Sequence, residues 1–62
     1  MQCSKVTVTI ETRNAAFDGR CRSEVARILR DAASKLSDNV DDPPIVLFDI
    51  NGNRVGELTI LT

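Results

Sequence analysis

The chain has 62 residues, a formal net charge of −1, no His and two Cys. This length predicts a single small domain, residues 1–62, of a size that buries only about 60% of its unfolded surface. No stretch approaches the roughly 18 apolar residues of a membrane span, and no N-terminal segment has the apolar core of a signal peptide. We therefore expect a cytoplasmic protein that does not enter membranes. Its near-neutral charge argues against a general polyanion binder.

The composition also argues against an enzyme. Without His, neither a Ser-His-Asp nor a Cys-His arrangement can form. The two cysteines, Cys3 and Cys21, are far apart, whereas a structural zinc site usually takes four Cys or His ligands in two close pairs. The sequence has no glycine-rich phosphate-binding loop. It thus predicts no catalytic residue, no metal site and no cofactor.

Residues 5–12 alternate between apolar and polar side chains, with Val6, Val8 and Ile10 on one side. Such alternation in a segment rich in Val, Ile and Thr predicts a half-buried strand. Asn14 can then cap or turn the chain, and residues 15–17 can form one helical turn. Phe17, one of only two aromatic residues, is expected to close the edge of the core.

A helix is predicted next, with Asp18 as its N-cap and an end at residues 37–39. Its apolar stripe has helical period and consists of Cys21, Val25, Ile28, Leu29, Ala32 and Leu36. Glu24 falls on the polar faces of this helix. The stripe predicts that Cys21 is a buried, inert thiol. The alternative is an activated thiol, because Cys21 lies near the helix N-terminus between two arginines.

Two strands, residues 45–50 and 55–61, flank an Asn51-Gly52 pair that is typical of a β-hairpin. A two-residue turn would pair Val46 with Glu57, and a three-residue loop would pair Val46 with Leu58. Burial favours the second register, with Asn53 in the left-handed conformation, although a bulge at Gly56 could rescue the first. Residues 49–53 also resemble the start of a calcium loop. The required Gly and Glu at its sixth and twelfth positions are missing.

These elements predict an α+β fold of β-α-β-β order, in which one helix packs on one face of a three-stranded sheet with a C-terminal β-hairpin. The strand order is not specified. The helix side of the sheet is expected to carry Val6, Val8, Ile10, Val46, Phe48, Ile50, Leu58 and Ile60, which pack against the apolar stripe.

In this arrangement Ile45, Leu47 and Val55 point away from the helix, where nothing covers them. Uncovered apolar side chains usually mark an interface. We therefore expect these residues to form a partner or dimer face, used for a homodimer or for a host or phage protein.

A second candidate surface is basic. Arg20, Arg27 and Arg30 can form an anion-contacting patch on the exposed side of the helix. Phosphate contacts from such a patch would support a nucleic-acid-binding accessory protein, the alternative function. The absence of Tyr and Trp, which stack on bases in many such proteins, argues against it.

Three stretches, residues 14–17, 24–30 and 49–56, together resemble a set of very small, uncharacterised accessory proteins of bacteriophages and prophages of Gram-negative bacteria. The resemblance extends over about residues 6–56. It implies a cytoplasmic phage protein in the host cell that binds and modulates a host or phage protein. It implies no catalytic or binding residues.

Overall fold

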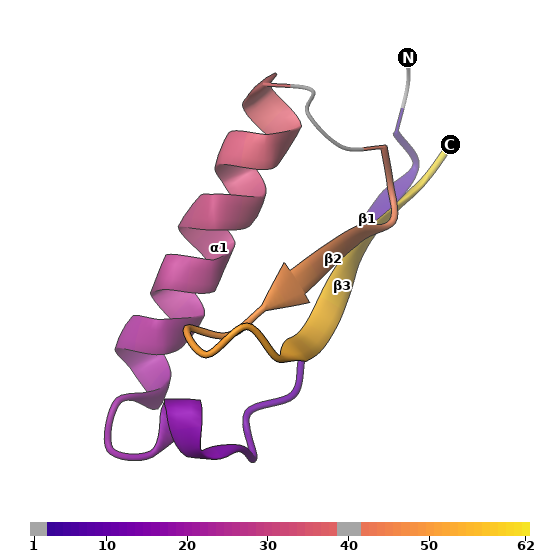
Figure 1. Cartoon of the computed structure of the whole chain (residues 1–62). Helices are drawn as coiled ribbons and strands as arrows, with labels where there is room; N and C mark the ends of the chain where they lie inside the picture. The colour runs from indigo at the N-terminus through magenta and orange to yellow at the C-terminus, as the bar shows by residue number, and fades with distance from the viewer. Residues whose placement is uncertain (1–2, 39–41) are drawn as a thin grey trace.

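The computed structural model describes residues 3–38 and 42–62 of the chain. Figure 1 shows one long helix beside a narrow, twisted sheet. The elements follow the predicted order, and the helical turn expected at residues 15–17 is a 3-10 helix. They are β1 (Lys5–Ile10), η1 (Ala15–Phe17), α1 (Cys21–Asp38), β2 (Ile45–Phe48) and β3 (Arg54–Leu61). The predicted α+β class, with one helix on a three-stranded sheet and a C-terminal hairpin, is confirmed.

The strand order is β1-β3-β2, and both pairs are antiparallel. β1 and β2 therefore run in the same direction on either side of β3, and both are edge strands. The chain crosses from β1 to β2 through α1, which follows the sheet on the side of β2 (Figure 1). This order leaves β1 as the strand farthest from the helix, and its apolar side chains Val6 and Val8 are exposed as a result.

The hairpin register differs from the predicted one. Val46 pairs with Glu57, as the rejected two-residue turn requires, and Ile45 pairs with Leu58. The register then shifts between Leu47 and Phe48, so that one extra residue of β3 is accommodated beside Gly56. A bulge next to Gly56, the alternative that could rescue this register, is what the fold uses. It turns Ile45 and Leu47, rather than Val46 and Phe48, toward the helix.

Two backbone hydrogen bonds of Asp49 close the turn. The Asp49 N–H donates to the Asn53 carbonyl at 2.9 Å, and the Gly52 N–H donates to the Asp49 carbonyl at 3.0 Å. Gly52, not Asn53, supplies the left-handed residue, with φ of 86°. Glycine occupies that region without the steric cost that a Cβ imposes.

The approach to α1 is a capped 3-10 turn. Asn14 accepts the Ala16 N–H at 3.0 Å through its side-chain oxygen, which confirms its predicted capping role. Gly19, at φ of 69°, then redirects the chain. The Glu24 N–H donates to the Arg20 carbonyl, so Arg20 caps the helix and Cys21 is its first residue. The prediction of Asp18 as the N-cap is wrong, since Asp18 ends the 3-10 turn instead.

The core lies between α1 and the β2–β3 hairpin. Its buried apolar members are Ala16, Phe17, Ile28, Ala32, Ile45, Leu47, Val55 and Leu58. Phe17, Ile28, Ala32 and Leu58 confirm the prediction, and Ile10, Val25 and Ile60 pack at the rim of this core. Val46 is half-buried. The predicted core positions Val6, Val8, Leu29, Leu36, Phe48 and Ile50 are wrong, because the structure leaves them exposed.

Candidate protein interface

The predicted partner face does not exist as a surface. Ile45 and Leu47 are each 1% exposed and Val55 is 6% exposed, because all three face the helix. The physical reason is the register: a one-residue slip of a strand moves its whole set of side chains to the opposite face. The expectation that these residues point away from α1 is therefore wrong, and any interface must be sought elsewhere.

Two side chains of α1 bond the backbone at the C-terminal end of the outer edge of β2. In the hairpin, the backbone of Asp49 bonds toward β3, so the neighbouring groups of Phe48 and Ile50 point outward. Arg27 Nη2 donates to the Phe48 carbonyl at 3.1 Å, and the Ile50 N–H donates to Glu24 Oε2 at 2.8 Å. These side chains occupy the bonding sites at this end of the strand.

Glu24 and Arg27 also bind each other, with two contacts of 2.8 and 3.1 Å between the guanidinium and the carboxylate. This bond from Arg27 lowers the pKa of Glu24, and the Ile50 N–H lowers it further against the opposing effect of burial. The same bond raises the pKa of Arg27. The Glu24–Arg27 pair therefore stays charged where it closes the β2 edge.

Asp49 organises the loop that the Glu24–Arg27 pair holds. Its Oδ1 accepts the N–H groups of Asn51 and Asn53 at 2.9 and 2.8 Å, and its Oδ2 accepts Asn14 Nδ2 at 2.7 Å. Burial by itself raises the pKa of Asp49, but the donors from Asn53, Asn14 and Asn51 outweigh it and hold the pKa below its ordinary value. The loop that resembled a calcium site is thus a carboxylate-centred turn tied to the segment before η1.

β1 has no comparable closure among the described residues. The Glu11 N–H donates to the Val55 carbonyl at 2.7 Å, and the strands pair in register from Lys5 with Leu61 to Ile10 with Gly56. Because antiparallel bonding alternates, Lys5, Thr7 and Thr9 bond toward β3. The N–H and C=O groups of Val6, Val8 and Ile10 then point to the free side of the strand. We call this side the open edge of β1.

The side chains of the same residues face the layer that contains the helix. Val6 lies opposite Ile60 and Val8 opposite Leu58, a core residue, so Val6 and Val8 are on the inner face of the sheet. α1 does not cover them, and they are 51% and 39% exposed. An apolar inner face without a second layer is the strongest sign of an interface in this molecule.

One flank of α1 adds to that surface. At about 100° per residue, Leu29 and Leu36 lie beside Val25, on the opposite side of the Ile28–Ala32 line from Arg27 and Lys35. Arg27 and Lys35 both contact Phe48 of β2, and Lys35 lies 5.9 Å from the centre of its ring.

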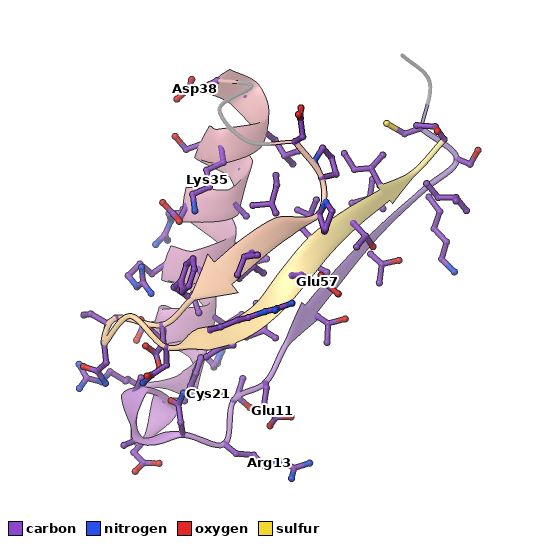
Figure 2. The ribbon with its side chains drawn as sticks, turned by 45° about the vertical axis from the view of Figure 1, so that its right-hand side comes forward. Glu11, Arg13, Cys21, Lys35, Asp38 and Glu57 are labelled. Atoms are coloured by element: carbon purple, nitrogen blue, oxygen red, sulfur yellow. The ribbon has the colours of Figure 1, made fainter. Side chains whose placement is uncertain are left out.

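The Leu29–Leu36 flank therefore faces the β3 and β1 side of the sheet. Both leucines are exposed, at 44% and 39%. We define the β1 apolar patch as Val6, Val8, Leu29, Leu36 and the half-buried Ile60. Figure 2 shows the opposite side of the molecule, where Lys35 lies on α1 beside β2, while Glu57 lies on β3 and Glu11 and Arg13 follow β1.

The predicted arginine patch is divided. Arg27 binds Glu24 and the Phe48 carbonyl through its Nε and Nη2, so its charge is already paired within the protein. Arg20 and Arg30 are exposed, and within residues 3–38 and 42–62 neither forms an ion pair. The structure thus pairs one of the three predicted phosphate-contacting arginines with a carboxylate, and nucleic-acid binding remains a prediction.

The cysteines offer no built site. Both Cys3 and Cys21 are free and exposed, so the expectation of a buried Cys21 is wrong. Within the part of the chain that the structure describes, no three His, Cys, Asp or Glu side chains are grouped to hold a metal ion. In that same part, no helix has the length and apolar character needed to cross a membrane.

Sequence reasoning missed the two buried carboxylates. Glu24 and Asp49 are each 4% exposed. Helical period alone puts Glu24 only about 40° from Ile28 and thus at the margin of the buried stripe, but its partners come from 3 to 26 residues away. Asp49 carried a local signal, since Asp commonly bonds the backbone two residues ahead in turns of this composition.

Comparison of the chain with protein-family models, with curated proteins and with solved structures found no match.

Proposed function

We propose that this domain is a non-enzymatic protein-binding module and that its binding site is the open edge of β1 together with the β1 apolar patch. The observation that carries the proposal is the exposure of Val6 and Val8 on the inner face of the sheet, the face that is normally covered. An open strand edge supplies backbone hydrogen bonds to a partner, and an adjoining apolar surface supplies burial. This combination is typical of recognition by strand addition.

The resemblance to small phage accessory proteins implies a biological context for this module. In that context it works in the cytoplasm of a Gram-negative host, where it binds and modulates a host or phage protein. Within the described residues, the sheet offers β1, a strand of six residues, as an open edge for such a partner. A strand of this length is typical of added strands in globular proteins.

Site-specific photo-crosslinking in a Gram-negative host tests the proposal. A photoreactive phenylalanine derivative is introduced at Val8 or Leu29, within the site, and at Ser34, which is exposed on a different flank of α1. Binding through the proposed site predicts protein adducts from positions 8 and 29 and none from position 34. An absence of adducts at positions 8 and 29, or equal yields at all three positions, would overturn the proposal.

A further inference from the structure

We propose that the protein which occupies this site is a second copy of the chain, and that two β1 strands pair antiparallel with Val8 on the twofold axis. The inference rests on the proposed function, because it names the partner for the same site. It draws on three features of β1: the direction of its free backbone groups, the position of its charges and the face on which its apolar side chains lie.

The backbone of β1 is suited to a symmetric partner. The free N–H and C=O groups belong to Val6, Val8 and Ile10, the alternate residues that do not bond to β3. With Val8 on the axis, the two Val8 residues exchange both of their hydrogen bonds. Val6 and Ile10 of one copy do the same with the partner's Ile10 and the partner's Val6. Every free group of the open edge between Val6 and Ile10 then has a partner.

The charges select this register. Lys5 starts the strand and lies on the outer face with Thr7 and Thr9, and Glu11, which follows the end of the strand, is the next residue in this alternation. With Val8 on the axis, Lys5 lies opposite the partner's Glu11 at both ends of the joined strands. Cross-strand pairs of opposite charge stabilise a sheet. With Thr7 on the axis, Lys5 would instead face the partner's Thr9, and neither charge would be matched.

Glu11 is available for this contact. Its present partner is Arg13, at 3.1 Å, and both side chains are largely in solvent. A carboxylate has two oxygens and can accept from Arg13 and from Lys5 together. Exposed ion pairs are weak, so the contribution of these pairs is to register more than to affinity.

The pairing also accounts for the β1 apolar patch. A twofold axis perpendicular to the sheet joins two three-stranded sheets into one continuous sheet and leaves both α1 helices on the same face. The Leu29–Leu36 flanks then face each other above the two β1 strands. Val6 and Val8, which one helix leaves uncovered, come to lie between two helices. Burial of this surface supplies the apolar contribution to association.

The oligomeric state and two charge substitutions test this directly. Sedimentation equilibrium from about 10 μM to about 1 mM spans weak to moderate affinities. The wild-type chain is expected to reach twice its 6.8 kDa mass in this range. Val8→Lys places two like charges beside the axis and is expected to weaken dimerisation about tenfold or more. Thr9→Lys adds the same charge to the outer face of the same strand and is the matched control.

A charge exchange tests the register. Lys5→Glu or Glu11→Lys alone creates a like-charge contact at each end and should weaken the dimer about threefold or more. The double substitution restores opposite charges and should return the dimerisation constant to near its original value. In the wild-type dimer, the amide of Val8 should also become protected from hydrogen exchange.

A wild-type chain that stays monomeric, or equal effects of Val8→Lys and Thr9→Lys, would overturn the dimer. Single charge variants that dimerise like wild type, or a double variant that does not recover, would overturn the register. Photo-crosslinking separates the two proposals. An adduct of position 8 with a different protein, from a monomeric chain, keeps the proposed function and overturns the dimer. The absence of any adduct from a monomeric chain overturns both.

Discussion

The two edges of the sheet show opposite solutions to one problem, the unpaired backbone groups of an edge strand. β2 has four residues, follows Pro44 and is bonded at its C-terminal end by Glu24 and Arg27 of the helix. β1 has six residues, lies away from the helix and bonds to nothing on its free side among the described residues. Natural sheets usually shorten, cover or charge their edges to prevent unwanted pairing. The contrast is the reason why the proposed binding site lies on the β1 edge and not on the β2 edge.

The largest expected effect comes from separating β1 from the sheet. A Cβ at Gly56 would overlap the backbone carbonyl of Thr9 on β1, so Gly56→Ala must displace one of the two strands. We expect a loss of about 3 kcal/mol or more in the free energy of unfolding, measured by urea denaturation. Gly52→Ala is the control. A Cβ there meets open space, and only the positive φ is strained, which costs about 1–2 kcal/mol. Equal losses would contradict the close approach of β1 and β3.

The next effect separates the core from the β1 apolar patch. Leu47→Ala, in the core, is expected to cost about 2–5 kcal/mol in the free energy of unfolding. Leu29→Ala, in the patch, is expected to cost less than about 1 kcal/mol in the monomer and to weaken association instead. Denaturation at a concentration below the dimerisation constant makes the comparison. A mild effect of Leu47→Ala would indicate that this residue lies on a surface after all.

Opening the β2 edge should have a smaller effect that is local. Arg27→Ala removes the donor to the Phe48 carbonyl and leaves Glu24 buried without its counter-ion. We expect a lower urea midpoint and faster hydrogen exchange at Ile50, whose N–H binds Glu24. Arg30→Ala removes the same charge from the exposed part of α1 and should leave both measurements unchanged. The closure of this edge would be in doubt if the two variants behaved alike.

The carboxylates of Glu24 and Asp49 predict a dependence of stability on pH. Both pKa values are lower in the folded chain than in the unfolded chain. The unfolded chain therefore binds more protons, and stability falls with acid. The stabilisation is complete above the ordinary carboxyl range, about pH 4–5, and is lost as the pH falls through the lower folded values. Urea midpoints at successive pH values should decline less steeply in Glu24→Gln. A decline of equal slope would assign the effect to other groups.

The smallest effect concerns the thiols. Cys3 and Cys21 are exposed, so both should react with a thiol reagent in the native protein without denaturant. Cys21→Ser should leave the urea midpoint unchanged, because its side chain is exposed. Slow reaction of Cys21 that speeds up only on unfolding would instead support the buried position that helical period suggests.

By itself the sequence determined the elements of this protein and their order. The alternation of β1, the helical period of residues 21–36, the Asn14 cap and the Asn-Gly turn are local signals, set by neighbouring residues along the chain. Local signals also identified part of the buried side of the helix, since Ile28 and Ala32 are buried as predicted. The candidate site was not predictable in this way, and the residues chosen for it were core residues.

Tertiary structure decided which side of each element is covered. A bulge of one residue beside Gly56 exchanged the two faces of β2, which buried Ile45 and Leu47 and exposed Phe48. The strand order placed β1 at the edge, beyond the reach of the single helix, and so left Val6 and Val8 uncovered. Neither the bulge nor the strand order can be predicted from the alternation of a strand. Period two determines which residues share a face but not which face meets the helix.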